Sequence, residues 1–504
     1  MINANSDRKG KICLIFIVCL LMTLTGCGGG SKSPSPVLKK LEIQPATATV
    51  QKDGTREFTA VGKDQNGKAM TIKPAWSVTG GIGTVAPSTG TTTTFTATAV
   101  GEGTIVAKVG DISGSAVITV SEEEVETPPD TIRVGVDKDY TTIQEAINAA
   151  IDGVTIIVDQ GRYEECIVIE NKSITLKSAN PDSETVVDGT IIDGNEEGST
   201  VFINGESNHQ TVTIEGFTIT GGSGSGVDGF GGGVYTSFIT TILRKNVISE
   251  NAAQNGGGGI HARSGKLVLE ENKIKANSSD NAGGGLYLKD ILVATLTDNQ
   301  ILENTSRNNI DYTENGGGGI YANSVNGTWS GNIIKDNTAK SCGGLCLYNS
   351  AINLIDNQII HNTADMGYGG IFVRFDYFHE MEIKDNTISE NQAGSYCGGL
   401  GLSSSYVEDE LELVGNTINN NLAFYGGGIY VGANVKITNN IISGNTVKPG
   451  MGGGIYVCNG KELTGSGNEF TNNQGYAIYL YESATWTNEG GNTFSGNTPD
   501  DVSP

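Results

Sequence analysis

The chain contains few charged residues and few prolines, and both shortages exclude whole classes of protein. Charged residues make up 17% of the 504 residues, against roughly 25% in ordinary soluble domains. The 32 basic and 56 acidic residues give a formal net charge of −24, which excludes a general nucleic-acid binder, because phosphate binding needs a positive field. Only 11 prolines accompany 72 glycines, so the chain is not collagen-like. A hydrophobic share of 37% excludes a flexible low-complexity chain.

The first residues carry the features of an export signal. Arg8, Lys9 and Lys11 precede an apolar run over residues 12–24, which is too short to span a bilayer comfortably. A basic segment followed by such a run is typical of a secretory signal peptide. We place this signal peptide at residues 1–26.

The apolar run ends in Leu24-Thr25-Gly26-Cys27, which resembles the lipobox of bacterial lipoproteins. The resemblance implies cleavage before Cys27, lipidation of its sulfur, and a mature protein anchored to a membrane, at the outer membrane or the cell surface. The alternative is an ordinary secreted signal in which Cys27 has no role. Residues 27–37 form the expected tether.

The remaining cysteines have no regular spacing. Beyond the signal peptide and Cys27, the cysteines are Cys166, Cys342, Cys346, Cys397 and Cys458. An odd and irregular set is not a disulfide framework, and we interpret these residues as small buried hydrophobic side chains. The sequence has 4 histidines but no His-x-x-x-His pair and no Cys/His cluster, so we expect no metal and no cofactor.

Residues 38–121 consist of short runs of β-branched residues separated by Gly, Asn and Pro. Short strands at roughly ten-residue spacing are typical of a β-sandwich, and we expect Trp76 to lie in its core. Three segments, Leu41-Glu-Ile-Gln-Pro, Pro74-Ala-Trp-Ser-Val and Gly101-Glu-Gly-Thr-Ile, resemble the group 2 bacterial Ig-like domains. The resemblance implies a spacer or an adhesive module.

Beyond an acidic, proline-bearing linker at residues 122–130, a repeat with two motifs continues along the chain. A glycine cluster followed by an apolar residue has its last glycine at Gly233, Gly259, Gly285, Gly319, Gly344, Gly370, Gly399, Gly428 and Gly454. A second motif, Asn-x-[Ile/Val/Phe]-x-x-Asn, begins at Asn246, Asn272, Asn299, Asn332, Asn357, Asn386, Asn416, Asn440, Asn468 and Asn492. Two motifs that recur in matching phase indicate a repeat architecture.

The residues that follow each glycine cluster indicate strands. The first is always Val, Ile or Leu and the third is small or apolar, so both point inward and the residue between them points outward. Short strands in a repeat of about 26 residues, with Gly and Asn at the corners, predict a right-handed parallel β-helix of about a dozen coils over residues 131–504. The expected fold class is all-β, a solenoid preceded by a small Ig-like sandwich.

The sequence also indicates how the solenoid begins and how its corners are formed. Ile143, Ala146, Ile147 and Ala150 share one helical stripe, which predicts a helix over residues 141–150 that caps the core. This stretch and the strands after it resemble the start of pectin-lyase-like β-helix proteins, a resemblance that implies the fold and no particular activity. We interpret the asparagines as left-handed corners and hydrogen-bonded ladders, and the glycines as positive-φ corners.

An aromatic column and a basic column are expected on the outside of the solenoid. Aromatic faces stack on sugar rings, and Arg or Lys pairs with uronate or sulfate groups. We predict a glycan-binding face that projects to solvent and consists of His261, Arg263, Tyr287, Lys289, Tyr321, Phe372 and Arg374. The alternative is that the aromatic residues form a structural ladder and the cations only keep the solenoid soluble.

Two functions remain open. The first, which we favour, is a lipid-anchored surface protein without catalysis that binds a polysaccharide or a cell-surface glycan, and no nucleic acid. The second is a polysaccharide lyase or glycoside hydrolase acting on an acidic polysaccharide. A lyase needs a base and a cation that stabilises a carbanion, for which Arg374, Asp376 and His379 are the candidates. The Asn-Thr-Asp, Gly-His-Gly and Arg-Ile-Lys segments of polygalacturonases are absent, as is the Asp-Pro-His-Asp of alginate epimerases.

Lipidation of Cys27 is tested by replacing it with serine. Cys27→Ser is expected to release the protein from membranes or to leave its signal peptide uncleaved, because serine has no thiol to acylate. Membrane fractionation and the mass of the mature chain measure both effects. Cys166→Ser, which changes a cysteine outside the lipobox, is the control. A Cys27→Ser protein that fractionates and matures like the wild type would show that the lipobox resemblance is misleading.

Overall fold

The computed structural model describes residues 35–122, 130–225, 228–307, 316–376, 381–404, 410–447 and 451–503. The expected signal peptide, Cys27, most of the expected linker and the candidate residue His379 lie outside the described residues. Contacts divide the chain into two compact units, Met1–Thr127 and Pro128–Pro504. Each unit is described by itself.

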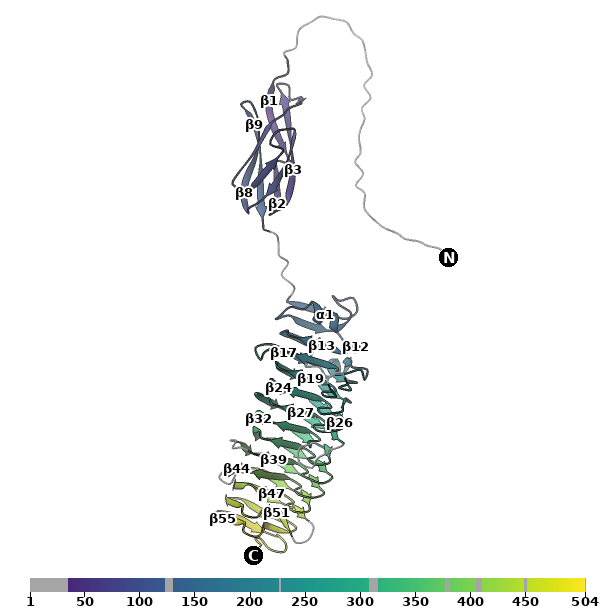
Figure 1. Ribbon diagram of the computed structural model, residues 1–504, viewed down its shortest axis with the longest axis vertical. Helices are drawn as coiled ribbons and strands as arrows, with labels where there is room; N and C mark the ends of the chain where they lie inside the picture. The colour runs from purple at the N-terminus through teal and green to yellow at the C-terminus, as the bar shows by residue number, and fades with distance from the viewer. Residues whose placement is uncertain are drawn as a thin grey trace, which may run out of the picture. The chain divides into compact units, whose positions relative to one another are not determined.

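The first unit is a sandwich of two small β-sheets (Figure 1). Its strands are β1 (Leu38–Gln44), β2 (Thr47–Gln51), β3 (Thr55–Asp64), β4 (Ala69–Met70), β5 (Ala75–Thr79), β6 (Gly83–Ala86), β7 (Thr92–Ala97), β8 (Gly101–Val109) and β9 (Ile112–Ser121). One sheet has the order β1-β3-β7-β6, with β4 beside β3, and the other has the order β2-β9-β8-β5. Phe58, Phe95 and Trp76 are buried in the core, and the Trp76 indole N–H donates to the Gly90 carbonyl at 2.7 Å. The predicted sandwich is confirmed.

The second unit is a parallel β-helix whose coils stack along one axis (Figure 1). A 14-stranded sheet runs from β10 (Thr131–Val134) to β55 (Thr485–Gly490), and a 13-stranded sheet runs from β12 (Gly161–Glu164) to β56 (Thr493–Ser495). A short 8-stranded sheet runs from β22 (Ala252–Ala253) to β50 (Thr446–Val447). The predicted solenoid is confirmed.

The remaining, 12-stranded sheet carries the predicted glycan-binding face. Its strands are β13 (Ile167–Glu170), β16 (Val201–Asn204), β19 (Val234–Ser237), β23 (Ile260–Arg263), β27 (Leu286–Lys289), β31 (Ile320–Asn323), β35 (Leu345–Tyr348), β39 (Ile371–Phe375), β43 (Leu400–Ser404), β47 (Ile429–Gly432), β51 (Gly452–Val457) and β54 (Tyr476–Leu480). Ile260, Leu286 and Ile320 pair in register and are fully buried. The inward columns are therefore as predicted.

A short helix covers the first coils. Helix α1 (Ile143–Ala149) begins after Thr142, whose hydroxyl accepts the backbone N–H of Glu145 at 3.3 Å. Its residues Ile143, Ala146 and Ile147 are buried in the solenoid core. The apolar stripe of the sequence thus forms the expected cap. A second helix, α2 (Glu184–Gly189), precedes the strand β15 (Thr190–Asp193).

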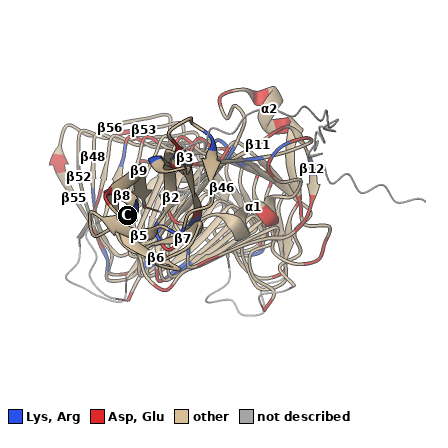
Figure 2. Ribbon diagram, turned by 90° about the horizontal axis from the view of Figure 1, so that it is seen from above, with Lys and Arg blue, Asp and Glu red and all other residues tan. Residues whose placement is uncertain are grey.

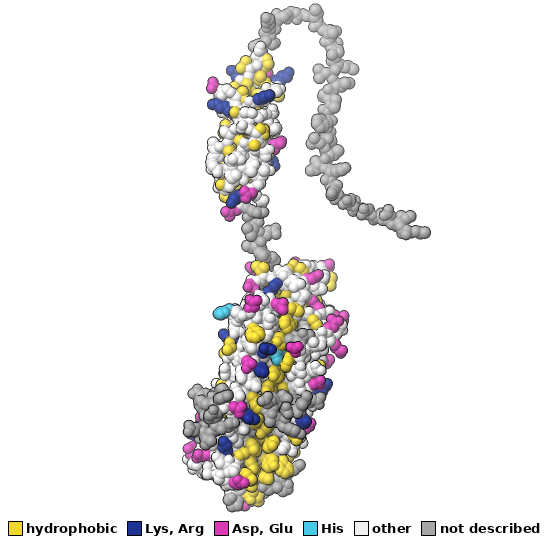
Figure 3. Space-filling view, viewed as in Figure 1, with side chains coloured by type: hydrophobic (Ala, Val, Ile, Leu, Met, Phe, Trp, Pro, Cys, Tyr) yellow, Lys and Arg dark blue, Asp and Glu magenta, His cyan; other side chains and the backbone are white. Residues whose placement is uncertain are grey.

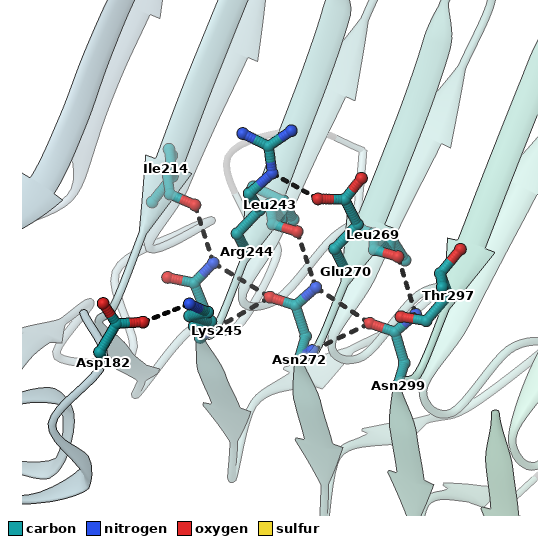
Figure 4. A network of polar contacts seen from close by, with 11 residues as sticks. Asp182, Ile214, Leu243, Arg244, Lys245, Leu269, Glu270, Asn272, Thr297 and Asn299 are labelled. Atoms are coloured by element: carbon teal, nitrogen blue, oxygen red, sulfur yellow. Dashed lines mark hydrogen bonds and ion pairs between the residues drawn. The ribbon is translucent and has the colours of Figure 1, made fainter. Parts of the chain in front are cut away.

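A ladder of buried asparagines runs along the axis, and Figure 4 shows part of it. The side-chain Nδ2 of Asn272 donates to the Leu243 carbonyl at 2.8 Å and to Oδ1 of Asn299 at 3.0 Å. The backbone N–H of Asn272 donates to the same Oδ1 at 3.0 Å. The ladder consists of Asn246, Asn272, Asn299, Asn332, Asn357, Asn386, Asn416, Asn440, Asn468 and Asn492. This ladder is formed by the first asparagine of each motif. The sixth residue of each motif is also an asparagine, and these residues form a second ladder.

The second ladder repeats the same hydrogen bonds. It consists of Asn251, Asn277, Asn304, Asn337, Asn362, Asn391, Asn421, Asn445, Asn473 and Asn497. The expected left-handed corners, however, lie one residue before the asparagines. Glu271 has φ of 55° and Ala276 has φ of 54°, and each turns the chain so that the following amide points into the coil. The ladder interpretation is confirmed, and the assignment of the corner to the asparagine itself is wrong.

The last glycine of each cluster is required by the close approach of neighbouring coils. A Cβ on Gly259 would lie 2.8 Å from the Gly285 carbonyl oxygen, and one on Gly285 would lie 2.6 Å from that of Gly319. Positive φ occurs two residues earlier in the cluster, at Gly257 (69°) and Gly283 (63°). The glycines therefore serve both as corners, as expected, and as spacers between coils.

Charged residues contribute little to the interior. Figure 2 marks the positions of Lys, Arg, Asp and Glu along the ribbon in blue and red. Among the described residues of the solenoid, Asp193 is the one buried residue with a charged side chain, apart from histidine. Within the described part of the chain, no helix has the length and the apolar character needed to cross a membrane.

Because of the ladders, we expect the loss of one buried amide to lower the free energy of unfolding substantially. Asn304→Ala would leave the backbone N–H and Nδ2 of Asn277 without their acceptor, and the Ile274 carbonyl without its donor. A buried group without a partner costs about 1–3 kcal/mol, so we expect destabilisation by about 3 kcal/mol. Urea unfolding followed by circular dichroism measures the loss. Asn459→Ala, at an exposed asparagine, should change stability little; equal effects of the two variants would contradict the ladder's role.

Candidate functional site

The predicted aromatic column forms a continuous stack over four coils on the outer side of the 12-stranded sheet, and Cys346 interrupts it between Tyr321 and Phe372. Tyr235, His261, Tyr287 and Tyr321 occupy the same register position in β19, β23, β27 and β31. Neighbouring rings in this series are stacked, with centroids 5.0–5.1 Å apart. The parallel pairing of the strands places equivalent side chains one above the other, so the aromatic rings stack in register.

Much of this column is buried, contrary to the expectation that it faces solvent. His261 is 3% exposed, Tyr321 is 4% exposed and Phe372 is 8% exposed, whereas Tyr287 is half-buried. The cause is the glycine corner, which folds back over the strand that follows it. The Phe230 ring lies 4.6 Å from that of His261, and a Cβ on Gly256 would lie 2.6 Å from Cδ2 of Tyr287. The sequence argument gave the direction of these side chains correctly and missed what covers them.

The neighbouring basic column remains accessible. Arg263 and Lys289 are paired in register on β23 and β27, and both side chains are exposed. Neither forms an ion pair with another described residue. The Arg263 guanidinium carbon lies 5.7 Å from the ring centre of Phe238, a side chain that is itself 46% exposed. Two unpaired cations therefore lie side by side, next to an exposed aromatic ring.

Figure 3 shows how the surface of this face is composed. A band of apolar side chains runs along the solenoid face that carries β19, β27, β39, β47 and β51 in Figure 1, and basic side chains lie beside its upper part. The lower part of the band has mainly apolar side chains at the surface. The face thus has a basic segment and a neutral one.

His261 lies two residues before Arg263 on β23, in register with Tyr287 of β27. Its ring is stacked between Tyr235 and Tyr287, and its Nδ1 has no hydrogen-bond partner among the described residues. Burial, followed by the positive charges of Arg263 and Lys289, lowers the pKa of His261 to about 3. At neutral pH the imidazole is therefore uncharged, and it contributes a ring to the stack and no charge to the basic segment.

The neutral segment contains a group of aromatic residues that sequence reasoning missed. Tyr396 is 45% exposed, Phe424 and Tyr481 are also exposed, and Tyr425 is half-buried. The Tyr396 ring stacks on the rings of Tyr425 and Tyr368, with centroid distances of 5.9 Å and 5.6 Å. A signal was present, since Tyr368, Tyr396 and Tyr425 each lie within or immediately before a glycine cluster. We call Tyr396, Phe424, Tyr425 and Tyr481 the tyrosine group.

The phenols that pack beneath the tyrosine group stay uncharged. Burial is the largest cause that raises the pKa of Tyr368, Tyr430 and Tyr456 above the ordinary tyrosine value. Tyr430 and Tyr456 stack almost in parallel, with centroids 5.5 Å apart. The neutral segment therefore presents aromatic rings and hydroxyl groups that carry no charge.

The candidate lyase residues are only partly described. Arg374 lies on β39 in register with Tyr348, and its Nε lies 3.3 Å from Oδ1 of Asp376. The two charges therefore offset each other. His379 lies outside the described residues. Within the described residues, no group of three or more His, Cys, Asp and Glu side chains is placed to hold a metal ion.

Comparison with known proteins supports the fold. The family model for a right-handed β-helix region matches residues 318–498. No curated protein matches the chain. The matched segment covers the C-terminal coils of the solenoid, where the structure has the parallel sheets of such a fold.

Solved structures show distant likenesses. The catalytic unit of a thermostable GH87 α-1,3-glucanase from Streptomyces thermodiastaticus strain HF3-3 has 15% identity and a TM-score of 0.39, covering 86% of this chain and 77% of that one. Domains 5–6 of the S-layer protein SbsC have 22% identity and a TM-score of 0.17, covering 20% of this chain and 54% of that one. The chain thus spans about half of that S-layer fragment. Similarity at these TM-scores assigns no activity.

The buried histidine predicts a dependence of stability on pH. The pKa of His261 is about 3 in the folded protein and about 6.5 in an unfolded chain, so the unfolded state binds more protons between these values. Stability should therefore fall as pH decreases from 6.5 toward 3. His261→Phe keeps a ring in the stack and removes this titration, so it should gain stability relative to wild type as pH falls. Urea unfolding midpoints at pH 7, 5 and 4 measure the difference, and an unchanged difference across this range would contradict the prediction.

Proposed function

We propose that this protein is a lipid-anchored cell-surface protein that binds an acidic polysaccharide along the outer face of its β-helix. The observation that carries the proposal is the pair of exposed, unpaired cations Arg263 and Lys289 on adjacent strands. They occur in a chain with a net charge of −24. Two cations kept side by side without a protein counter-charge favour a ligand that supplies negative charge.

The spacing of the cations suits a polymer with repeated anionic groups. Adjacent strands of a sheet lie about 4.8 Å apart, so Arg263 and Lys289 can contact the same acidic sugar or two neighbouring ones. Carboxylate and sulfate groups accept charge-assisted hydrogen bonds from both side chains. Phe238 and the half-buried Tyr287 lie next to these cations and present apolar ring surface for the sugar.

The tyrosine group extends the proposed site toward the neutral end of the band. Tyr and other aromatic rings provide rigid, amphipathic contact area at low entropic cost. The exposed faces of Tyr396, Phe424 and Tyr481 therefore suit the apolar faces of sugar rings. A long polysaccharide could contact the cations with one stretch and the aromatic side chains with another.

The proposed role assigns separate tasks to the other parts of the chain. Cys27 carries the lipid and residues 27–37 form the tether. The sandwich of residues 38–121 acts as a spacer between the membrane and the β-helix. These assignments rest on the lipobox and Ig-like resemblances of the sequence.

A polysaccharide lyase or hydrolase is the less favoured alternative. Its proposed cation, Arg374, is paired with Asp376, whereas a lyase needs a positive group free to stabilise the carbanion formed next to a uronate. Arg263 and Lys289 are free cations, but the imidazole of His261, two residues before Arg263, is buried and neutral. The described residues therefore favour binding over catalysis.

Binding is tested by removing the two cations together. Arg263→Ala with Lys289→Ala should weaken the affinity for an acidic polysaccharide such as polygalacturonate about tenfold, because two exposed ionic contacts contribute about 0.7 kcal/mol each. The wild-type affinity should fall with added salt, since exposed charges are screened within about 10 Å at 0.1 M. Isothermal titration calorimetry on the chain without residues 1–27 measures both effects.

A matched control makes the same change of net charge elsewhere. Lys273→Ala with Lys275→Ala alters the strand β25 (Lys273–Lys275) of the 13-stranded sheet and should leave affinity unchanged. Equal loss of affinity in the control would mean that binding depends on net charge and not on this face. Absorbance from an unsaturated sugar product during incubation would identify a lyase and overturn the proposal.

A further inference from the structure

Cys342 and Cys346 face each other inside the glycine corner before β35. Their thiol sulfur atoms lie 2.6 Å apart, well inside the van der Waals separation of two sulfur atoms, and both side chains are buried. Only Gly343, Gly344 and Leu345 separate them in the sequence. The corner must therefore reverse the chain tightly enough to bring the two side chains together.

The neighbouring coils show that this reversal is built into the fold. In the next coil, Tyr368 and Phe372 occupy the equivalent positions and pair in register with Cys342 and Cys346. The rings of Tyr368 and Phe372 stack with centroids 4.0 Å apart. The side chains at these two positions thus meet in both of these coils.

The surroundings leave little room for the two sulfur atoms to separate. A Cβ on Gly316, in the preceding coil, would lie 2.9 Å from each sulfur atom. The pair also belongs to a buried cluster with Ala282, Tyr321 and Phe372. Within the described residues, no group of three or more candidate ligands surrounds the pair, so a metal site is not supported.

We infer that Cys342 and Cys346 form a disulfide that closes the corner between Ser341 and β35. Each thiol loses its proton and the two sulfur atoms form one bond. Two electrons pass to an oxidised thiol–disulfide exchange partner, which is released as a dithiol. An exported protein meets such partners, whereas cytosolic thiols are kept reduced. The inference therefore rests on the proposed export, and it does not depend on polysaccharide binding.

Burial indicates when the bond forms. Burial raises the pKa of the Cys342 thiol well above its ordinary value, and the thiolate is the form that attacks a disulfide. The folded corner is therefore unreactive, so oxidation has to occur while the coil is still open to solvent. Once formed, the bond joins the two ends of the corner, Cys342 and Cys346. It therefore limits how far these two residues can separate.

A single peptide tests the inference directly. Trypsin cleaves after Lys340 and Arg374, and residues 341–374 contain no other Lys or Arg and no other cysteine. The full-length exported chain is quenched in acid, unfolded and alkylated without reductant, then digested and analysed by mass spectrometry. We expect the peptide 341–374 without alkyl groups and two hydrogen masses below the dithiol form, and with two alkyl groups when reductant precedes alkylation.

The same digest holds a matched control. Residues 385–436 form a tryptic peptide in which Cys397 is the one cysteine, and Cys397 is buried as Cys342 is. It should be alkylated with and without reductant. Two alkyl groups on the 341–374 peptide of the exported, unreduced chain would overturn the inference. Membrane fractionation of the same preparation shows separately whether export occurred, so failure of the proposed function is distinguishable from failure of the disulfide.

A variant gives a second, independent reading. Cys342→Ser with Cys346→Ser should lower the thermal unfolding temperature, because the reopened corner loses its covalent restraint. Cys397→Ser, a single replacement at a buried cysteine, should lower it by less than half as much. An equal shift in the two variants would contradict a structural bond, even if both proteins fold.

Discussion

The structure depends on the hydrogen bonding of each coil to the next one in strict register. Parallel strands stack at about 4.8 Å, and most strand residues of a coil consequently have the equivalent residue of the next coil as their neighbour. This constraint explains why the same residue types recur at each position. Asparagine amides satisfy one another along the ladders, aliphatic side chains pack on aliphatic ones, and the last glycine of each cluster leaves room for the carbonyl oxygen of the next coil.

Register also explains which parts of the molecule could be predicted from the sequence. Ile260 and Arg263 were placed on opposite faces by counting along one strand, because alternation in a strand is a local property. The burial of His261 could not be predicted in this way. It depends on how Gly257 turns the chain and on the contact of Phe230, in the preceding coil, with the imidazole ring. The meeting of Cys342 with Cys346 depends on the same reversal, so irregular cysteine spacing gave no sign of it.

The outer face combines a buried framework with a small accessible surface. The rings of Tyr235, His261 and Tyr321 are part of the framework, since they are buried and stack along the outer side of the sheet. Arg263, Lys289 and the tyrosine group lie on its outside. The structural ladder thus describes the buried rings, and the ligand-binding face is proposed only for the exposed residues of the same region. Exposure, and not residue type, distinguishes them.

The direction of the ladders has a mechanical consequence. The hydrogen bonds between coils, including those from Asn272 to Asn299, connect one coil to the next along the solenoid axis. A pulling force along that axis loads the bonds of the terminal coil first, because each coil contacts only its neighbours. The solenoid would then lengthen by peeling one coil at a time and dissipate the force in small steps. A protein anchored at its N-terminus and bound to a polymer along its outer face would bear such a load in the coils between the two attachment points.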